Sequence, residues 1–496
     1  MKNIFLKHER LMRRMLEILP GFTSWSLILF PFWGSFFSPA IVAYFVLLFD
    51  VFWFYKSATF AFTVVLSHLR IKASEQLDWV GEAKGFSDWQ KVSHVIIVAT
   101  AKEPLHLLRR TFASLAAQDL PRKQLFVVLA MEAIEDPAQR KIKERELRQE
   151  FGKKLPNIFV TVHELKENEI KGKHANERYA AMWVYENLIK KGRLTLDYTT
   201  VTSCDADHVY HCKYFSYLTF KFLDDPGRYE KFWQPAILFY NNFWRIPALS
   251  RVANTFGSLW NMSLLSRKDR MINQQNYSLS FTLLNKVGYW DPKVIPEDYH
   301  IFFKAYFGTK GKAEVEPIYL PLYADAAESR GFLKTTRNQY EQFKRWAWGV
   351  SDDPYVIRSY FLVPGVPFWD KTVRVLRLIE DHFLWPVNWF IITVGVNIPT
   401  FLNPNFGRTI LGFTLPRLSS LILTICLVFL VVILIVDWRQ RPPRPSGVSR
   451  WRAVLIPFEF ILMPVAGFIF TALPGLDAHT RLMLGRYIEY RVTEKV

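Results

Sequence analysis

Apolar residues concentrate at the two ends of the 496-residue chain, and a more polar stretch separates them. The first apolar stretch covers about residues 22–66 and is interrupted near Pro39. It is far longer than the roughly 7–15 apolar residues of a signal peptide. The pattern therefore predicts two membrane-crossing helices at about 19–37 and 39–57, followed by an interfacial helix that ends near Lys72.

The C-terminal part has apolar spans at about 383–402, 414–436 and 453–473. Each span approaches the roughly 20 residues that cross a bilayer. Residues 366–381 mix aromatic, aliphatic and basic positions, as an interfacial helix does. The last span contains Glu459 and two prolines. It either crosses the membrane or forms a re-entrant or interfacial hairpin that keeps the tail inside.

Short β-branched runs alternate with helical stretches between these apolar ends. Continuous apolar runs of this kind predict buried parallel strands, and their alternation with helices predicts a doubly wound α/β sheet. Ligands of such sheets bind beyond the carboxyl ends of the strands, where Glu103, Glu132 and Asp205 fall. The four predicted strands cover residues 95–100, 125–130, 158–162 and 198–204.

The composition fits a chain that has both a membrane part and a polar domain, since half of the residues are hydrophobic and 22% are charged. The net charge is +18, and much of the excess lies beside apolar runs, which favours lipid headgroups over nucleic acid as partners. The positive-inside rule places residues 1–18, 438–452 and the 85–365 domain in the cytoplasm. The three cysteines argue for a reducing compartment and against a disulfide framework.

Two carboxylates, Asp205 and Asp207, directly follow the fourth predicted strand. Side chains in this arrangement can hold a hard divalent cation against a diphosphate, because Mg²⁺ prefers one or two carboxylates together with phosphate oxygens. The alternative is a pair of solvated acids in a loop. A zinc site is not expected, because no Cys/His cluster has the required spacing.

Glu297 and Asp298 begin a predicted helix, where carboxylates also act simply as caps. A functional interpretation makes Asp298 a general base that deprotonates an acceptor hydroxyl. Lys173 stands in a basic Lys-Gly-Lys segment just before another helix, so it is either close to a phosphate or part of a solvated loop.

Gln342, Arg345 and Trp346 have helical i, i+3 and i+4 spacing and therefore share one face. A guanidinium suits a leaving diphosphate, and an indole face suits a sugar ring. In the structural alternative, Trp346 packs at the membrane interface together with Trp348.

These motifs, in this order, resemble the family 2 glycosyltransferases, specifically the membrane-embedded branch that includes cellulose, chitin and hyaluronan synthases. The resemblance covers roughly residues 90–350. Pro296 replaces the threonine of the family's Thr-Glu-Asp motif, and Glu132 stands where the second strand usually ends in aspartate. The donor and acceptor segments that the resemblance implies contain Thr100, Glu103, Glu132, Lys173, Asn176 and Gln234.

The resemblance implies a GT-A-type fold and an inverting transfer from a nucleotide-sugar, for which we expect a UDP-sugar. Mg²⁺ or Mn²⁺ would bind Asp205 and Asp207, and Arg345 with Lys173 would stabilise the departing nucleoside diphosphate. Asp298 would act as the base beside Glu297. Acceptor contacts would come from Gln234, Gln342 and Trp346.

Three functions remain open from the sequence. The first hypothesis is processive synthesis of a polysaccharide, which the Gln-x-x-Arg-Trp element at 342–346 favours. The second is a single transfer to a lipid or short acceptor, and the small number of membrane segments reduces the preference for the first over it. The third is a non-catalytic scaffold for glycan export, against which the presence of Asp205, Asp207, Asp298 and Trp346 argues. The expected partners are the nucleotide-sugar, a glycan or lipid-linked acceptor and membrane lipids, without nucleic acid. We expect a multi-pass protein of a bacterial plasma membrane with a cytoplasmic catalytic domain.

The predicted organisation has a mixed α/β sheet domain flanked by transmembrane helices on both sides. Its parts are an N-terminal membrane region at 1–75, the transferase domain at 85–350, interfacial helices at 351–381, two to three membrane helices at 382–474 and a tail at 475–496.

Overall fold

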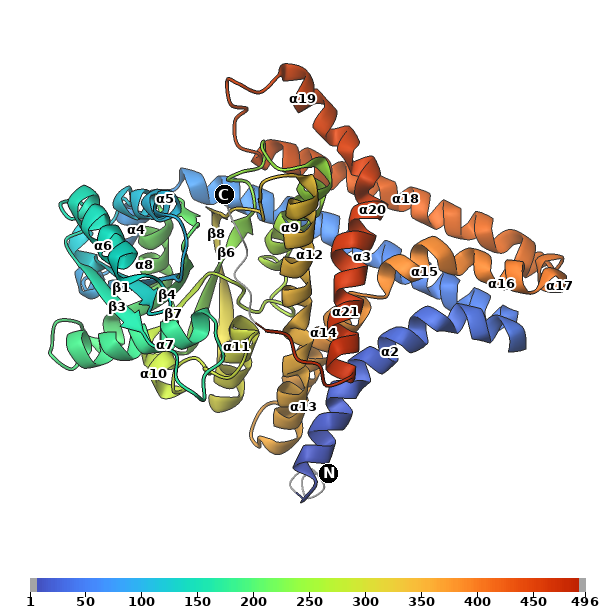
Figure 1. The fold of residues 1–496 in the computed structure, drawn as a ribbon, viewed down its shortest axis with the longest axis horizontal. Coiled ribbons are helices and arrows are strands. Elements are labelled where there is room, and N and C mark those ends of the chain that lie inside the picture. Colours follow the sequence, from blue (N-terminus) through green and yellow to red (C-terminus); the bar gives the residue numbers. More distant parts are fainter. Residues whose placement is uncertain (1–6, 490–496) are drawn as a thin grey trace.

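An eight-stranded sheet forms the core of the left-hand part of the protein in the computed structural model, which describes residues 7–489 (Figure 1). The strand order is β3-β2-β1-β4-β7-β6-β8-β5. The strands are β1 Ser93–Thr100, β2 Leu125–Glu132, β3 Ile158–His163, β4 Thr199–Asp205, β5 Val209–Tyr210, β6 Lys231–Leu238, β7 Tyr277–Ser280 and β8 Glu314–Tyr323.

The first four strands are parallel, as their continuous apolar runs predict. β1 lies between β2 and β4, with Ala99 opposite both Ala130 and Asp205. β7 then runs antiparallel to β4 and to β6, so the complete sheet is mixed. The predicted fold class, a doubly wound mixed sheet between terminal apolar helices, is confirmed.

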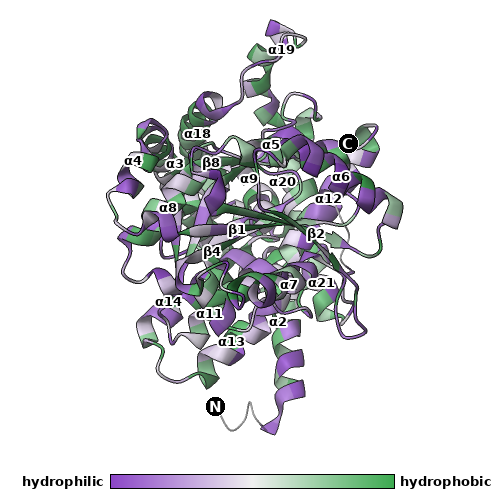
Figure 2. Cartoon of the chain, turned by 90° about the vertical axis from the view of Figure 1, so that its left-hand side faces the viewer, coloured by the Kyte–Doolittle hydropathy of each residue, from purple (hydrophilic) through white to green (hydrophobic). Residues whose placement is uncertain are grey.

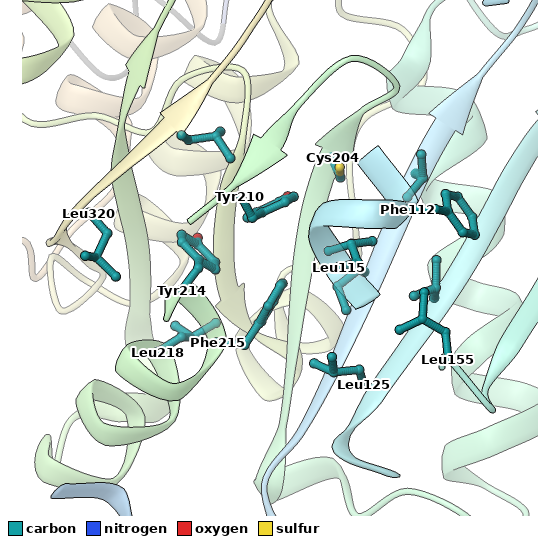
Figure 3. Close-up of a cluster of buried hydrophobic side chains, with 14 of the residues drawn as sticks. Phe112, Leu115, Leu125, Leu155, Cys204, Tyr210, Tyr214, Phe215, Leu218 and Leu320 are labelled. Carbon is teal, nitrogen blue, oxygen red and sulfur yellow. The ribbon is translucent and has the colours of Figure 1, made fainter. Parts of the chain in front are cut away.

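Helices cover both faces of the sheet. This is needed because successive residues of β1 are apolar and point to opposite faces, so both faces must be shielded from water. Ile96 and Val98 belong to one buried cluster and Val95 and Ile97 to the other. Figure 3 shows part of the first cluster, in which Phe112 and neighbouring apolar side chains pack together. The first face carries α5 Leu105–Ala116, α6 Pro137–Phe151 and α8 Tyr214–Asp224, and the second carries α7 Lys173–Val184, α10 Phe281–Lys286 and α11 Glu297–Gly308.

The sheet's outer helices present polar surfaces while its strands are apolar, as Figure 2 shows by colour. Four further helices lie between the sheet and the long apolar helices of the two terminal regions, which are called the membrane-type helices below. They are α9 Ala248–Leu264, α12 Phe332–Ala347, α13 Asp353–Leu362 and α14 Phe368–Leu384, the last covering the segment predicted to be interfacial.

Four helices within residues 7–489 are long and apolar enough to cross a membrane. Three of them, α2 Glu9–Phe37, α3 Pro39–Gln76 and α18 Ile410–Gln440, extend to the right in Figure 1. α14 and the segment Asn388–Leu402 form a helix pair bent by 54° that also passes this test when taken together. That segment contains α15 Asn388–Val394 and α16 Ile398–Leu402 and is followed by α17 Pro404–Gly407.

The second helix corrects one sequence prediction. α3 is a single helix of 38 residues, whereas a span ending near residue 57 and a separate interfacial helix were expected. Its C-terminal part carries Ala61, Val64 and Ile71, which are buried against residues of β6 and α9. These side chains pack on the sheet domain, whereas Phe62 and Leu69 of the same segment are 68% and 58% exposed, so this part of α3 has one face against protein and one apolar face outward.

The fourth apolar helix has a different direction. Residues Arg450–Met483 run vertically beside α12 in Figure 1, across the direction of α3 and α18. Glu459, near its start, pairs with Arg251 of α9 at 2.9 Å, and Asp477, near its end, lies 3.3 Å from Lys344 of α12. The segment comprises α19 Arg450–Leu455, η8 Ile456–Leu462, α20 Met463–Gly467, η9 Phe468–Ala472 and α21 Leu473–Met483.

Candidate active site

A cavity of about 1510 Å³ lies beyond the carboxyl ends of β1 and β4 and continues between the apolar helices. Among the described residues it collects nearly all of the predicted site, although the predicted residues are scattered along the chain. Those that line it are Thr100, Glu103, Glu132, Lys173, Asn176, Asp205, Asp207, Glu297, Asp298, Gln342, Arg345 and Trp346.

Lys173 joins the first two acidic motifs. It is the first residue of α7, and its Nζ lies 2.7 Å from Asp205 Oδ1 and 3.9 Å from Glu297 Oε1. A third carboxylate, Glu177, lies one helical turn further at 3.7 Å. Burial alone lowers the pKa of Lys173, but these carboxylates outweigh it and hold the pKa above its ordinary value. The lysine is therefore a permanent positive charge at the centre of the site.

Asp298 is the second residue of α11, and backbone groups fix both of its carboxylate oxygens. Oδ2 accepts a hydrogen bond from the N–H of Gln275 at 3.0 Å, and Oδ1 accepts one from Tyr299 at 2.9 Å. Burial, followed by the charge of Glu297, raises the pKa of Asp298 to about 7. Burial also raises the pKa of Glu297. A carboxylate with a pKa near 7 suits a general base at neutral pH.

The ligand atoms of Asp205, Asp207 and His208 lie within 4.8 Å of one another. Asp207 is buried, and its Oδ2 accepts a hydrogen bond from the N–H of Asp325 at 2.9 Å. His208 Nε2 is 3.8 Å from Asp205 Oδ2, and its Nδ1 contacts Asn276 Nδ2 at 3.0 Å. Two carboxylates at a strand end are the donor set that Mg²⁺ or Mn²⁺ prefers, so these residues fit the expected cation.

Gln275 is a site residue that the sequence interpretation missed. Its φ of 46° puts a non-glycine residue in the left-handed region, and backbone strain of this kind is found at functional sites. The conformation lets its N–H reach Asp298 and its carbonyl accept a hydrogen bond from Lys173 at 2.7 Å. The available signal was the run of four amide side chains at residues 273–276, just before β7.

The nucleotide-binding turn predicted after β1 is held by its own side chains. Glu103 Oε2 accepts hydrogen bonds from Thr100 Oγ1 at 2.8 Å and from the N–H of Ala101 at 2.6 Å. Glu132, at the end of β2, contacts His163 Nδ1 at 3.1 Å. Both glutamates line the cavity, and these contacts fix the shape of its edge.

Gln234 lies behind the site rather than in its wall. It is 5% exposed and falls outside the cavity lining of the described residues. Its Oε1 accepts a hydrogen bond from the N–H of Gln274 at 2.8 Å, and its Nε2 donates to the carbonyl of Asn276 at 3.1 Å. Because these bonds bracket Gln275, Gln234 positions the strained residue, and its contact with an acceptor stays a prediction.

The three motif residues of α12 face the cavity together, as their spacing predicts. Gln342 Oε1 accepts a hydrogen bond from Gln339 Nε2 at 2.9 Å, which fixes the orientation of its amide. Trp346 packs against Phe343 and Phe239, with ring centroids 4.8 Å and 5.6 Å away. Its half-buried indole forms part of the cavity wall at the level where the apolar helices begin.

Comparisons with known proteins match this part of the chain. Residues 200–436 match a family model described as "Glycosyl transferase family group 2". The matched segment begins in β4 and includes Asp205, Asp298 and Trp346. No curated protein matches the chain in sequence.

Several solved structures show a more distant likeness. The mannosyltransferase PcManGT from Pyrobaculum calidifontis, in complex with GDP-Man and Mn²⁺, is 14% identical with a TM-score of 0.45, covering 89% of this chain and 100% of its own. S. aureus TarS 1-349 in complex with UDP-GlcNAc is also 14% identical, with a TM-score of 0.32, covering 81% of this chain and 93% of its own. Both TM-scores are below 0.5.

Proposed function

We propose a specific reaction for this chain, which is a glycosyltransferase with a family group 2 segment at residues 200–436. The reaction is an inverting, metal-dependent transfer of a sugar from a nucleoside diphosphate donor, most simply a UDP-sugar, to an acceptor hydroxyl at the cytoplasmic face of a membrane. The enzyme class follows from the family match, whereas the inversion, the metal and the membrane face are the proposal.

The observation that carries the proposal is the bridge made by Lys173. Its ammonium lies 2.7 Å from the strand-end carboxylate Asp205 and 3.9 Å from Glu297, the neighbour of Asp298. Residues that are about ninety positions apart in sequence therefore meet at one cation. This supports a shared site in which a donor diphosphate and an acceptor base are brought together.

The proposed chemistry is a single displacement. The carboxylate of Asp298 removes the proton from the acceptor hydroxyl as that oxygen attacks the anomeric carbon. A new carbon–oxygen bond forms on one face while the bond to the donor diphosphate breaks on the other, which inverts the configuration. The bonding electron pair leaves with the diphosphate oxygen, and the charges of Lys173 and Arg345 stabilise it.

A divalent cation fits the same site, and Asp205 with Asp207 would hold it. When bound, it supplies positive charge that neutralises the diphosphate as negative charge develops there. Two contacts orient the carboxylates that would hold the cation. The N–H of Asp325 donates to Asp207, and the ammonium of Lys173 donates to Asp205.

We further propose that the sheet domain and both ends of Arg450–Met483 lie on the cytoplasmic side. The ion pairs of Glu459 and Asp477 tie the two ends of this helix to the sheet domain. Eighteen residues of helix separate those two acids, or about 27 Å at 1.5 Å per residue, close to the thickness of a bilayer core. A helix that crossed the membrane would carry one end away from the domain, so these contacts support a helix along the interface.

A purified preparation in nanodiscs tests the proposed reaction. We expect at least one member of a panel of UDP- and GDP-sugars to release its nucleotide, with the sugar appearing on an acceptor in the opposite anomeric configuration. Retained configuration would contradict the single displacement, and no nucleotide release from any donor would contradict the reaction itself.

A further inference from the structure

We propose that the acceptor is an amphipathic lipid, and that the apolar limb of the cavity binds its hydrocarbon chain while its hydroxyl headgroup faces Asp298. The apolar limb is the part of the cavity between the membrane-type helices, with Phe60, Leu423, Leu427, Leu430, Phe460 and Met463 in its wall. The inference rests on the proposed function and adds the class of acceptor to it.

The chemistry of the wall favours a hydrocarbon over a glycan. On α18, Leu423, Leu427 and Leu430 recur at helical spacing and turn one apolar face to the cavity. Every sugar unit of a translocating glycan carries several hydroxyls, and each one needs a hydrogen-bond partner when it leaves water. The leucine, phenylalanine and methionine side chains of this wall offer none, whereas they gain by excluding water from a methylene chain. Elsewhere the cavity lining also holds Asn388, Thr393 and Thr471, so the inference rests on the α18 and η8 side of the limb.

The apolar limb is also open towards the side where a bilayer would lie. Leu427 is 56% exposed and Ile461 is 84% exposed, although both line the cavity. The apolar wall therefore continues onto the outer surface between α18 and η8. A lipid can enter by this route with its chain in an apolar environment throughout, whereas a soluble acceptor cannot.

The catalytic end of the cavity and the apolar limb share a wall. Trp346 and Leu430 pack against the same buried cluster, which contains Phe343 and Phe460. One lipid molecule can therefore place its headgroup beside the Trp346 indole and its hydrocarbon chain beside Leu430. The cavity of about 1510 Å³ exceeds the roughly 300–1,000 Å³ of a single-ligand pocket, so it has room for a donor and a lipid together.

A cluster of ion pairs, formed by Lys56, Arg270 and Glu380 and called the belt below, lies in the cavity wall between the catalytic end and the apolar limb. Lys56 of α3 lies 3.0 Å from Glu380 of α14, and Arg270 lies 2.6 Å from the other oxygen of that carboxylate. All three residues line the cavity. Because the cations already face carboxylates, the belt does not require an anionic headgroup, and together with the base at Asp298 it favours a hydroxyl-bearing one.

A photoreactive long-chain alcohol, hexadecanol with a chain diazirine, tests the inference in nanodiscs of phosphatidylcholine. The full-length protein is labelled and the adducts are mapped to single residues by mass spectrometry. We expect adducts on Leu427, Leu430 and Phe460, and a loss of at least threefold in the Leu430→Trp variant because the indole fills the apolar limb. Leu421→Trp is the matched control, since Leu421 is on the same helix, is 58% exposed and lies outside the cavity lining.

A kinetic arm compares decyl and ethyl glucosides as acceptors with whichever donor releases nucleotide. We expect kcat/KM to be at least tenfold higher for the decyl compound, and this preference to vanish in Leu430→Trp but not in Leu421→Trp. Two results would overturn the lipid inference: adducts confined to outward residues such as Val428, or equal rates for both glucosides. If nucleotide is still released in that case, the proposed function itself remains supported. A ladder of oligosaccharide products without adducts in the limb would overturn it in favour of a glycan path.

Discussion

The backbone of Gln275 connects Asp298 to Lys173: its N–H donates to Asp298 Oδ2 at 3.0 Å, and its carbonyl accepts from Lys173 Nζ at 2.7 Å. The proposed base and the proposed phosphate-facing cation are therefore held by opposite sides of one peptide segment. The left-handed φ of 46° at Gln275 makes this possible, because it turns both groups towards the site. The relative position of base and leaving group depends on this residue.

Gln275→Gly should keep both the fold and the activity. Glycine adopts positive φ without strain, and the relief of about 1–2 kcal/mol roughly offsets the extra chain entropy it loses on folding. Gln275→Val should lower the free energy of unfolding by about 1–3 kcal/mol, because a β-branched side chain resists this conformation. Thermal unfolding in detergent and the rate of transfer check both variants. A valine variant as stable and as active as the glycine variant would remove the argument from backbone strain.

The pH dependence of transfer should report the ionisation of Asp298. Burial and Glu297 raise its pKa from an ordinary 3.8 to about 7, and only the ionised form accepts a proton. The ionised fraction therefore falls below about pH 7, and kcat/KM should fall with it at unit slope. Glu297→Gln removes one source of the shift, so its acid limb should move to lower pH. A wild-type profile that stays flat down to pH 5 would exclude the assignment.

Transfer should require a divalent cation at Asp205 and Asp207. Excess chelator should abolish activity, and Mn²⁺ or Mg²⁺ should restore it. Asp207→Asn should raise the cation concentration needed for half-maximal rate by about tenfold or more, because a carboxylate ligand is lost. Asp197→Asn, outside the cavity lining of residues 7–489, is the matched control and should behave as wild type. Undiminished rates in excess chelator would refute the metal role.

Cysteine accessibility checks the placement of the last apolar helix. In sealed vesicles, an impermeant maleimide should label Leu11→Cys and Leu484→Cys from the same side, and Phe37→Cys from the opposite side. All three positions are exposed, and the variants are made in a Cys212→Ser background because Cys212 is itself exposed. The shared side follows from the contact of Arg14 with the carbonyl of Leu482 at 2.9 Å. Leu484→Cys labelling together with Phe37→Cys would show that residues 450–483 cross the membrane.

The sequence was sufficient to predict the four parallel strands and the convergence of the polar motifs, whereas β5 to β8 were not predicted. Continuous β-branched runs such as residues 95–100 have few alternatives to a buried strand, and a parallel sheet brings strand ends such as Asp205 to one edge. The continuity of α3 was not predicted, because burial against protein and burial against lipid need the same apolar side chains. The long-range pairing of Glu459 with Arg251 likewise has no local signature.

The finer parts of the site depend on contacts that a motif does not encode. Gln234 was predicted to meet the acceptor, yet its amide is occupied by the backbone on both sides of Gln275. The positive φ of Gln275 could not be predicted, because glutamine has no local preference for it. Glu177, which is fully buried beside Lys173, was also missed, because a single acid on a helix resembles any solvated position.

The most direct test of the account compares Asp298→Asn with the wild type in two assays on the same nanodisc preparation. Donor binding should remain within about threefold, because the amide keeps the size of the side chain. Sugar transfer should fall by about 100- to 10,000-fold, the usual contribution of a general base. Transfer by Asp298→Asn at the wild-type rate, with intact donor binding, would contradict the central claim that this carboxylate takes the acceptor's proton.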